Sequence, residues 1–360
     1  MTSASAAGGT DLLRATAELI DISSPSLGEG PLADEVEARL RQVPWLRVER
    51  HGDNVVARTG LGRPQRLVLA GHLDTVPANG NDVARIDGDT LWGLGAADMK
   101  GGLAVFLELA RTVAEPVCDV TYVFYAAEEI AAEHNGLLQL FRDRPELVQG
   151  DAAILGEPTD GWIEAGCQGT ARVRLALRGA RAHTARPWKG RNAIHRLGPV
   201  LDAIAAYVPR EPTIDGCAYR ESVQAVSVEG GVAGNVVPDE AVLTVNLRVA
   251  PDRTIVQGVE AFRTMVSPWL EPGDGFDVVD QAPPAPPSVS HPLLARVVAA
   301  GTPVRAKLGW TDVARFAEHG IPAVNLGPGD ALVAHTADEH VTRTSLERVH
   351  ASLHALLTGT

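Results

Sequence analysis

The chain has 360 residues, of which 45% are hydrophobic and 21% are charged, and its formal net charge is −13. This composition is typical of a globular protein with room for two domains, and the negative charge argues against nucleic acid and anionic membrane as partners. The opening MTSASAAGGTDLL contains neither a basic leader nor an apolar segment, and no 18-residue apolar run follows. We therefore expect a cytoplasmic protein without a membrane span, whose first ten residues fray.

Cysteine use excludes two kinds of structural site. Cys118, Cys167 and Cys217 are odd in number and widely separated. Their spacing fits neither a disulfide framework nor a zinc site built from cysteines. We expect three free thiols that are buried or half-buried.

The first half of the chain alternates amphipathic helical stretches with continuous apolar strands, which predicts an α/β layer structure over residues 10–170. The clearest strands are Arg66–Ala70, Val120–Tyr125 and Ala152–Leu155. Each is apolar on both faces and ends in polar residues, as buried parallel strands do. Functional residues of such sheets gather at the strand ends.

The pattern changes near residue 170 to the order β-α-β-β-α-β, which is typical of a ferredoxin-like α+β domain. The elements expected there are Arg172–Arg178, Asn192–Val208, Ser222–Val228, Ala241–Val249, Ile255–Val266 and Phe276–Val279. A proline-rich connector, residues 281–288, precedes a helix, a strand at Ala323–Leu326 and a closing helix from about Thr344. We predict a first domain formed by 1–170 and 285–360, with an inserted domain at 171–284.

Two motifs of the first domain place polar residues beside apolar segments. In Gly71–Pro77, His72 can bind a metal while Asp74 accepts the other ring N–H. In Gly93–Gly102, a glycine-rich turn before a helix carries Asp98 but lacks the sequence of a phosphate loop. Taken singly, a strand-end histidine or a turn aspartate is more often structural.

Further acids and a late histidine complete the pattern. Glu128 and Glu129 follow the third strand, Glu157 follows the fourth, and His335 lies in a loop of small residues. We expect the ends of four successive strands, together with this loop, to converge on one edge of a single sheet. Adjacent carboxylates resist burial unless a cation lies nearby.

The charges of these groups favour two metal ions. Two divalent ions, three carboxylate ligands and a bridging hydroxide make a neutral cluster, which two neutral imidazoles complete. One carboxylate remains as a base, so one of Glu128 and Glu129 binds metal and the other holds a proton. Carboxylate and imidazole ligands suit zinc, and paired metals activate water for hydrolysis.

These motifs, in this order and over the whole chain after residue 10, resemble the M20 family of dinuclear zinc metallopeptidases and amidohydrolases. The resemblance implies a mixed-sheet catalytic domain like that of zinc aminopeptidases, with an inserted ferredoxin-like domain that serves as lid and dimerisation surface. It also implies two zinc ions, which cobalt or manganese can replace.

The resemblance implies a role for each metal ligand. His72 and Glu157 would hold one zinc, Glu129 and His335 the other, and Asp98 would bridge the two.

Catalytic roles follow from the same resemblance. Asp74 would orient His72, and Glu128 would be the general base that takes a proton from the bridging water and delivers it to the leaving amine. From the partner subunit of a dimer, His183 would reach the developing oxyanion.

Substrate contacts are also implied. Asn235 would help to hold the substrate, and Arg248 would bind a carboxylate through two hydrogen bonds. Thr311 would contact the substrate, and Lys307 or Arg305 would meet its far end.

Four shorter stretches resemble one branch of the family, whose members hydrolyse the amide of N-succinyl-LL-2,6-diaminopimelate in lysine and diaminopimelate biosynthesis: residues 155–159, 164–170, 230–235 and 305–312. We therefore expect this small-molecule substrate and a homodimer. Alternatives are an aminoacylase, an acetylornithine deacetylase, a glutamate carboxypeptidase, or a relative that binds metal without catalysis.

Overall fold

The computed structural model describes residues 10–360, so the expected fraying of the first ten residues falls, apart from Thr10, outside them. The chain divides into two compact units. Unit 1 contains the residues up to Ala165, Ser288–Arg305 and Arg315–Thr360, and unit 2 contains Gly166–Pro287 and Ala306–Ala314. Within the described part of the chain, every helix is too short or too polar to cross a membrane.

The main sheet of unit 1 has the strand order β1-β2-β6-β3-β7-β16-β8-β15. Its strands are β1 (Arg47–His51), β2 (Asn54–Arg58), β3 (Arg66–His72), β6 (Asp119–Tyr125), β7 (Ala152–Leu155), β8 (Ile163–Ala165), β15 (Val304–Ala306) and β16 (Ala323–Asn325). Neighbouring strands among β6, β3, β7 and β16 are parallel. Their carboxyl ends therefore meet at one edge of the sheet, as predicted for the three strands found from the sequence.

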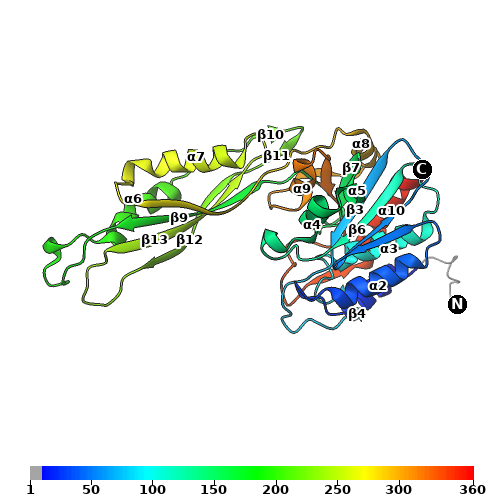
Figure 1. The fold of residues 1–360 in the computed structure, drawn as a ribbon, viewed down its shortest axis with the longest axis horizontal. Coiled ribbons are helices and arrows are strands. Elements are labelled where there is room, and N and C mark those ends of the chain that lie inside the picture. The colour runs from blue at the N-terminus through cyan, green and yellow to red at the C-terminus, as the bar shows by residue number, and fades with distance from the viewer. Residues whose placement is uncertain (1–9) are drawn as a thin grey trace. The chain divides into compact units, whose positions relative to one another are not determined.

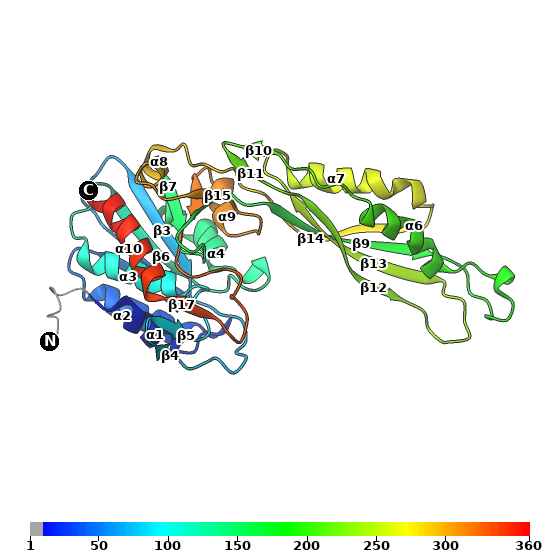
Figure 2. The same cartoon turned by 180° about the vertical axis from the view of Figure 1, so that it is seen from behind.

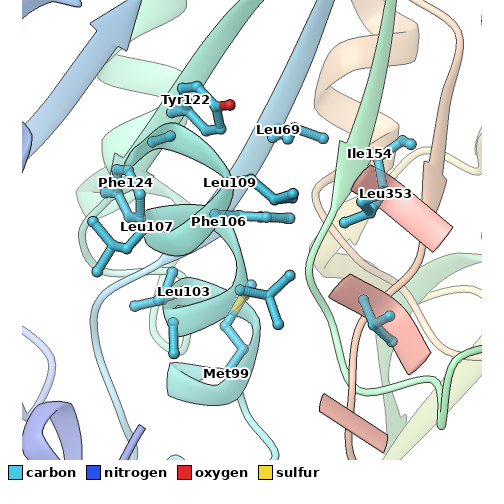
Figure 3. Packing of buried hydrophobic residues seen from close by; sticks show 14 of the residues in the cluster. Leu69, Met99, Leu103, Phe106, Leu107, Leu109, Tyr122, Phe124, Ile154 and Leu353 are labelled. Carbon is cyan, nitrogen blue, oxygen red and sulfur yellow. The ribbon is translucent and has the colours of Figure 1, made fainter. Parts of the chain in front are cut away.

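Helices pack on this sheet around a common apolar core. They are α1 (Leu12–Ile20), α2 (Gly30–Arg41), α3 (Lys100–Thr112), α4 (Gly136–Asp143), α5 (Pro145–Val148), α8 (Pro292–Ala299), α9 (Val313–Glu318) and α10 (Arg343–Thr358), with a 3-10 turn, η1, at Ala132–His134. Every residue of α3 from Lys100 to Ala110 is buried, because α1 and α10 contact it as well as the sheet (Figure 2). Figure 3 shows Phe106 of α3 among the side chains of this core.

Unit 1 contains a second sheet, which bears on the prediction that one sheet carries all the candidate acids. It has the order β17-β5-β4, with β4 at Arg85–Asp87, β5 at Thr90–Trp92 and β17 at His340–Thr342. The turn that carries Asp98 follows β5, so the prediction that four strands of one sheet supply the acids is wrong for this residue. Strands of three residues are too short to produce a periodic signal in the sequence.

Two glycines allow segments of the site to pack closely. A Cβ at Gly102 would collide with the carbonyl oxygen of Gly156, and so would a Cβ at Gly327. The absence of side chains at these positions lets three segments that carry candidate ligands approach one another.

Unit 2 has the predicted ferredoxin-like order. Its antiparallel sheet runs β12-β13-β9-β14, and α6 and α7 cover a core formed with these strands (Figure 1). The elements are β9 (Gly169–Arg178), α6 (Ala193–Ala205), β12 (Ser222–Gly230), β13 (Glu240–Val249), α7 (Ile255–Val266) and β14 (Gly275–Ala282), with a hairpin of β10 (Thr213–Ile214) and β11 (Cys217–Ala218) and 3-10 turns η2 (Pro187–Lys189) and η3 (Ser267–Trp269). All three cysteines are free and buried, as expected.

Candidate metal centre

His72 ends β3 and is almost completely buried, with 1% of its surface exposed. Its Nδ1 lies 3.0 Å from the carbonyl oxygen of Asp74 and 3.4 Å from the Asp74 carboxylate. Its Nε2 lies 3.1 Å from Oδ1 of Asp98. Burial alone would lower the pKa of His72, but its hydrogen bonds to the two aspartates outweigh burial and raise the pKa well above its ordinary value.

Asp74 holds the two glutamates that follow β6. Its carboxylate accepts the backbone N–H of Glu128 at 3.0 Å and that of Glu129 at 3.1 Å, and the Ser26 hydroxyl at 2.8 Å. Burial opposes ionisation of Asp74, but these donors and His72 lower its pKa to about 2. Asp74 therefore faces His72 and also fixes the position of the backbone at Glu128 and Glu129.

A second buried carboxylate, Glu29, supports the same turn and was not found from the sequence. Its Oε1 accepts the N–H of Ala127 at 3.0 Å, and Ala127 has a φ of 57°. An alanine in this left-handed region costs about 1 kcal/mol, which the hydrogen bond helps to offset. The three consecutive N–H groups of Ala127, Glu128 and Glu129 thus donate to two buried carboxylates. These hydrogen bonds join the turn to segments that are far from it in the sequence.

Glu339 plays the same part for the turn that carries Asp98, and it was also missed. Its Oε1 accepts the N–H of Ala97 and the N–H of Asp98, each at 3.0 Å. Glu339 is buried, with 1% of its surface exposed, and burial raises the pKa of its carboxyl group. It follows His335 by four positions, so one short segment carries a candidate ligand and holds the backbone of another. Its position four residues after the candidate ligand His335 is the only sequence feature that could have pointed to Glu339.

His335 contacts two of the candidate ligands. Its Nε2 lies 2.8 Å from Oε1 of Glu129 and 3.5 Å from Oδ2 of Asp98. Hydrogen bonds to Asp98 and Glu129 raise the pKa of His335 to about 10 against the effect of burial. For Asp98, burial favours the neutral acid, but the two histidines outweigh it and hold the pKa of Asp98 far below its ordinary value.

The structure brings the predicted ligands together in groups. Within each group one potential ligand atom per residue lies within 4.8 Å of the others. Among the described residues the groups are His72 with Asp98 and Glu157, Asp98 with Glu129 and His335, and His72 with Glu128 and Glu129. Asp98 belongs to the first two groups, which is the position that a bridging ligand requires.

The chemistry of these donors fits a pair of divalent metals. Each of the first two groups combines one imidazole with carboxylates, a set that zinc, cobalt and manganese accept. Ligand carboxylates must be ionised, and the pKa of the shared Asp98 is already held low. Glu157, buried at the end of β7, and the half-buried Glu129 supply the remaining negative charge.

The predicted substrate-contacting residues lie in unit 2, apart from Arg305. The exposed His183 is in an antiparallel bridge with Val236, and its Nδ1 accepts the N–H of Ala185 at 3.0 Å. The N–H of Thr184 donates to the carbonyl oxygen of Asn235 at 3.0 Å. The structure thus brings the segments of His183 and Asn235 side by side within unit 2.

The other predicted contacts are more dispersed. Arg248 lies on β13 opposite Ser222 of β12, and burial lowers the pKa of its guanidinium group. Thr311 is buried and Lys307 is half-buried. In unit 1, Arg305 donates to Glu164 at 2.8 Å, so its guanidinium already has an internal carboxylate partner.

Comparison with known proteins identifies the family to which the chain belongs. The model of peptidase family M20/M25/M40 matches residues 68–359. The chain belongs to this family.

Individual relatives narrow the comparison. The chain is 54% identical over 337 residues to a Mycobacterium tuberculosis protein provisionally named succinyl-diaminopimelate desuccinylase DapE, covering 92% of this chain and 93% of the relative. It is 43% identical over 347 residues to the succinyl-diaminopimelate desuccinylase of Corynebacterium glutamicum, covering 94% of each. A tripeptidase structure from Staphylococcus aureus superposes with a TM-score of 0.78 at 22% identity, over 96% of this chain and 97% of that one. The predicted fold class, a mixed-sheet α/β domain with an inserted ferredoxin-like domain, is confirmed.

Proposed function

We propose that this chain is a two-metal hydrolase that converts N-succinyl-LL-2,6-diaminopimelate to succinate and LL-2,6-diaminopimelate, in lysine and diaminopimelate biosynthesis in the cytoplasm. The observation that carries the hydrolytic part is the pair of donor groups that share Asp98, with Glu128 beside them. The substrate rests on the two relatives named as desuccinylases, which match the chain over more than nine-tenths of its length.

Five side chains would hold the metals. His72 and Glu157 would hold one ion, Glu129 and His335 would hold the other, and Asp98 would be shared, in keeping with the two groups of donor atoms. Two divalent ions, zinc in our proposal, supply Lewis acidity that polarises the amide carbonyl and makes water a stronger acid.

Glu128 would carry the proton. Its backbone N–H bonds to Asp74, and its carboxylate belongs to the donor group that includes His72 and Glu129. Glu128 takes a proton from the attacking water, whose oxygen ends in the new carboxylate of succinate. It then delivers that proton to the nitrogen as the C–N bond breaks, and the second proton of the water passes from the new carboxyl group to the amine, so the products are a carboxylate and an ammonium group.

Unit 2 would supply substrate contacts. His183, donated by the second copy of a homodimer, stabilises the negative oxygen of the tetrahedral intermediate, and Asn235 holds the substrate. Arg248 binds a substrate carboxylate through two hydrogen bonds, a role favoured by its partial burial without a carboxylate within 4 Å among the described residues. Thr311 and Lys307 contact the more distant part of the substrate.

The test is a desuccinylation assay with metal analysis on the same sample. We expect succinate release from N-succinyl-LL-2,6-diaminopimelate, two metal ions per chain, and much slower cleavage of N-acetylornithine and other N-acyl amino acids. Faster cleavage of another acyl amine would assign the chain to a different amidohydrolase. A sample with two bound metals and no activity toward any of these substrates would contradict the enzymatic proposal.

A further inference from the structure

A basic cleft lies at the end of the main sheet of unit 1 where β3 begins. Its volume is about 540 Å³, a size typical of sites for small molecules. Three of the residues that line the cleft are arginines, namely Arg47 of β1, Arg58 of β2 and Arg66 of β3, and none is acidic. The chain as a whole carries a net charge of −13, so such a concentration of positive charge departs from its average surface.

The strand register forces two of these charges together. Arg47 and Arg58 are directly opposite one another in the antiparallel pairing of β1 with β2. Like charges in such positions destabilise a sheet unless a counter-charge lies between them. Burial, and after it the charge of Arg58, lowers the pKa of Arg66, so the third guanidinium is close enough to add to the repulsion.

Carboxylates of unit 1 neutralise this cluster only in part. In the part of the chain that the structure describes, the ion pairs within 4.0 Å include none to Arg47 or Arg58, and the buried Nε of Arg58 has no hydrogen-bond partner. Arg66 lies 3.6 Å from Asp119, but that carboxylate also accepts Thr59 Oγ1 and two backbone N–H groups.

Another acid that the charge of Arg58 affects is paired elsewhere. Glu146, whose pKa is lowered mainly by Arg144 and only slightly by Arg58, bonds to Nε of Arg144 at 2.7 Å. Two of the three guanidiniums therefore have no carboxylate within 4.0 Å among the described residues, and the third, Arg66, shares Asp119 with three other donors.

We propose that this cleft binds a small dianion, with Arg47 and Arg58 as its principal ligands. Guanidinium groups match the oxygen spacing of phosphate and carboxylate through paired hydrogen bonds. The apolar residues Trp45 and Leu61 line the same cleft. Arg66 and His72 are the first and last residues of β3, so roughly 20 Å of strand separates the cleft from the metal centre.

The experiment is calorimetric titration of the metal-loaded protein with inorganic phosphate and, separately, with succinate at low ionic strength. The variant Arg47→Gln/Arg58→Gln removes the two principal ligands and spares Arg66, whose guanidinium donates to Thr59, Val120 and Thr121. A matched control, Arg14→Gln/Arg142→Gln, removes two charges at side chains that are 79% and 69% exposed.

We expect saturable binding to the wild type, with affinity at least about tenfold lower in the cleft variant and within about twofold of wild type in the control. The tighter of phosphate and succinate identifies the kind of dianion. Absence of saturable binding of both, or equal loss in both double variants, would overturn the proposal. So would unchanged affinity in the cleft variant, because the anion would then bind elsewhere, for example at the metals.

Thermal unfolding gives an independent check. Without added anion, the cleft variant should melt at or above the wild-type temperature, because the opposed charges are gone. Phosphate or succinate, whichever binds, should raise the melting temperature of the wild type clearly more than that of the variant, in which only binding outside the cleft remains. A variant that melts lower without anion would contradict the repulsion on which the proposal depends.

Discussion

The donor groups of unit 1 and the segment around His183 in unit 2 differ in how firmly their side chains are held. His72 and Asp74 are each 1% exposed, and the turns beside them bond to the buried carboxylates of Asp74, Glu29 and Glu339. His183 is exposed, and its ring accepts a hydrogen bond from the backbone N–H of Ala185. The proposed metal ligands are thus arranged in advance, whereas the proposed oxyanion residue must gain its remaining partners when substrate binds.

Replacement of the proposed base should have the largest effect. Glu128→Gln keeps the shape of the side chain but cannot accept a proton, so kcat should fall by about 10²–10⁴ while metal content stays at the wild-type value. Steady-state kinetics and metal analysis on one preparation would measure both. Glu133→Gln, at a position that is 78% exposed in the same region, is the control and should be fully active. A Glu128→Gln enzyme with near-normal turnover would remove Glu128 from the reaction.

Replacement of His183 should have the next largest effect and tests the other side of the comparison. His183→Ala should lower kcat by about 10²–10³ with little change in KM, melting temperature or metal content, since the contact forms mainly in the transition state. His195→Ala, an exposed histidine of the same unit, is the matched control. A rise in KM without a fall in kcat would instead make His183 a ground-state binding residue.

Glu339 should act through the backbone of Asp98. Glu339→Ala removes the acceptor of two N–H groups, so metal affinity should fall by roughly 10–100-fold. Glu339→Gln keeps one oxygen and should recover much of that affinity, while Asp338→Ala, at an exposed neighbour, should behave as wild type. Titration with a competing chelator would measure the affinities. Equal metal binding by the alanine variant and the wild type would show that the ligands hold their positions without Glu339.

The last prediction concerns the protons released from the two histidines when metal binds, and it has the smallest expected effect on turnover. The direction of its pH dependence is fixed by the pKa shifts. Hydrogen bonds to Asp98 and Glu129 raise the pKa of His335 to about 10, and hydrogen bonds to Asp74 and Asp98 raise the pKa of His72 against the effect of burial, so both rings hold a proton more tightly than a free imidazole does. Metals bind neutral imidazole, so loading should release protons, at least about one from His335, and metal affinity should rise with pH until it approaches 10.

Calorimetry in buffers of different ionisation enthalpy would count these protons. His335→Ala should release about one proton fewer. A count near zero for the wild type would show that the imidazoles of the metal-free protein are already neutral.

The sequence was sufficient to predict which candidate donors the fold brings together and the order of the elements in unit 2. Long apolar strands with polar residues at their ends, such as the strand before His72, carry a strong local signal, and parallel strands bring their carboxyl ends to one edge. The order β-α-β-β-α-β of unit 2 follows in the same way from local periodicity. These features depend on residues close together in the chain, so they can be read from it directly.

Tertiary structure decided which distant groups support those donors. Nothing near Glu29 in the chain indicates that its carboxylate bonds to Ala127, and nothing near Glu339 specifies Asp98. The opposition of Arg47 and Arg58 likewise depends on a strand register that each strand alone leaves open. Hydrogen bonds and repulsions of this kind join residues that only folding brings together, and their strength comes from burial and distance, which are properties of the folded chain.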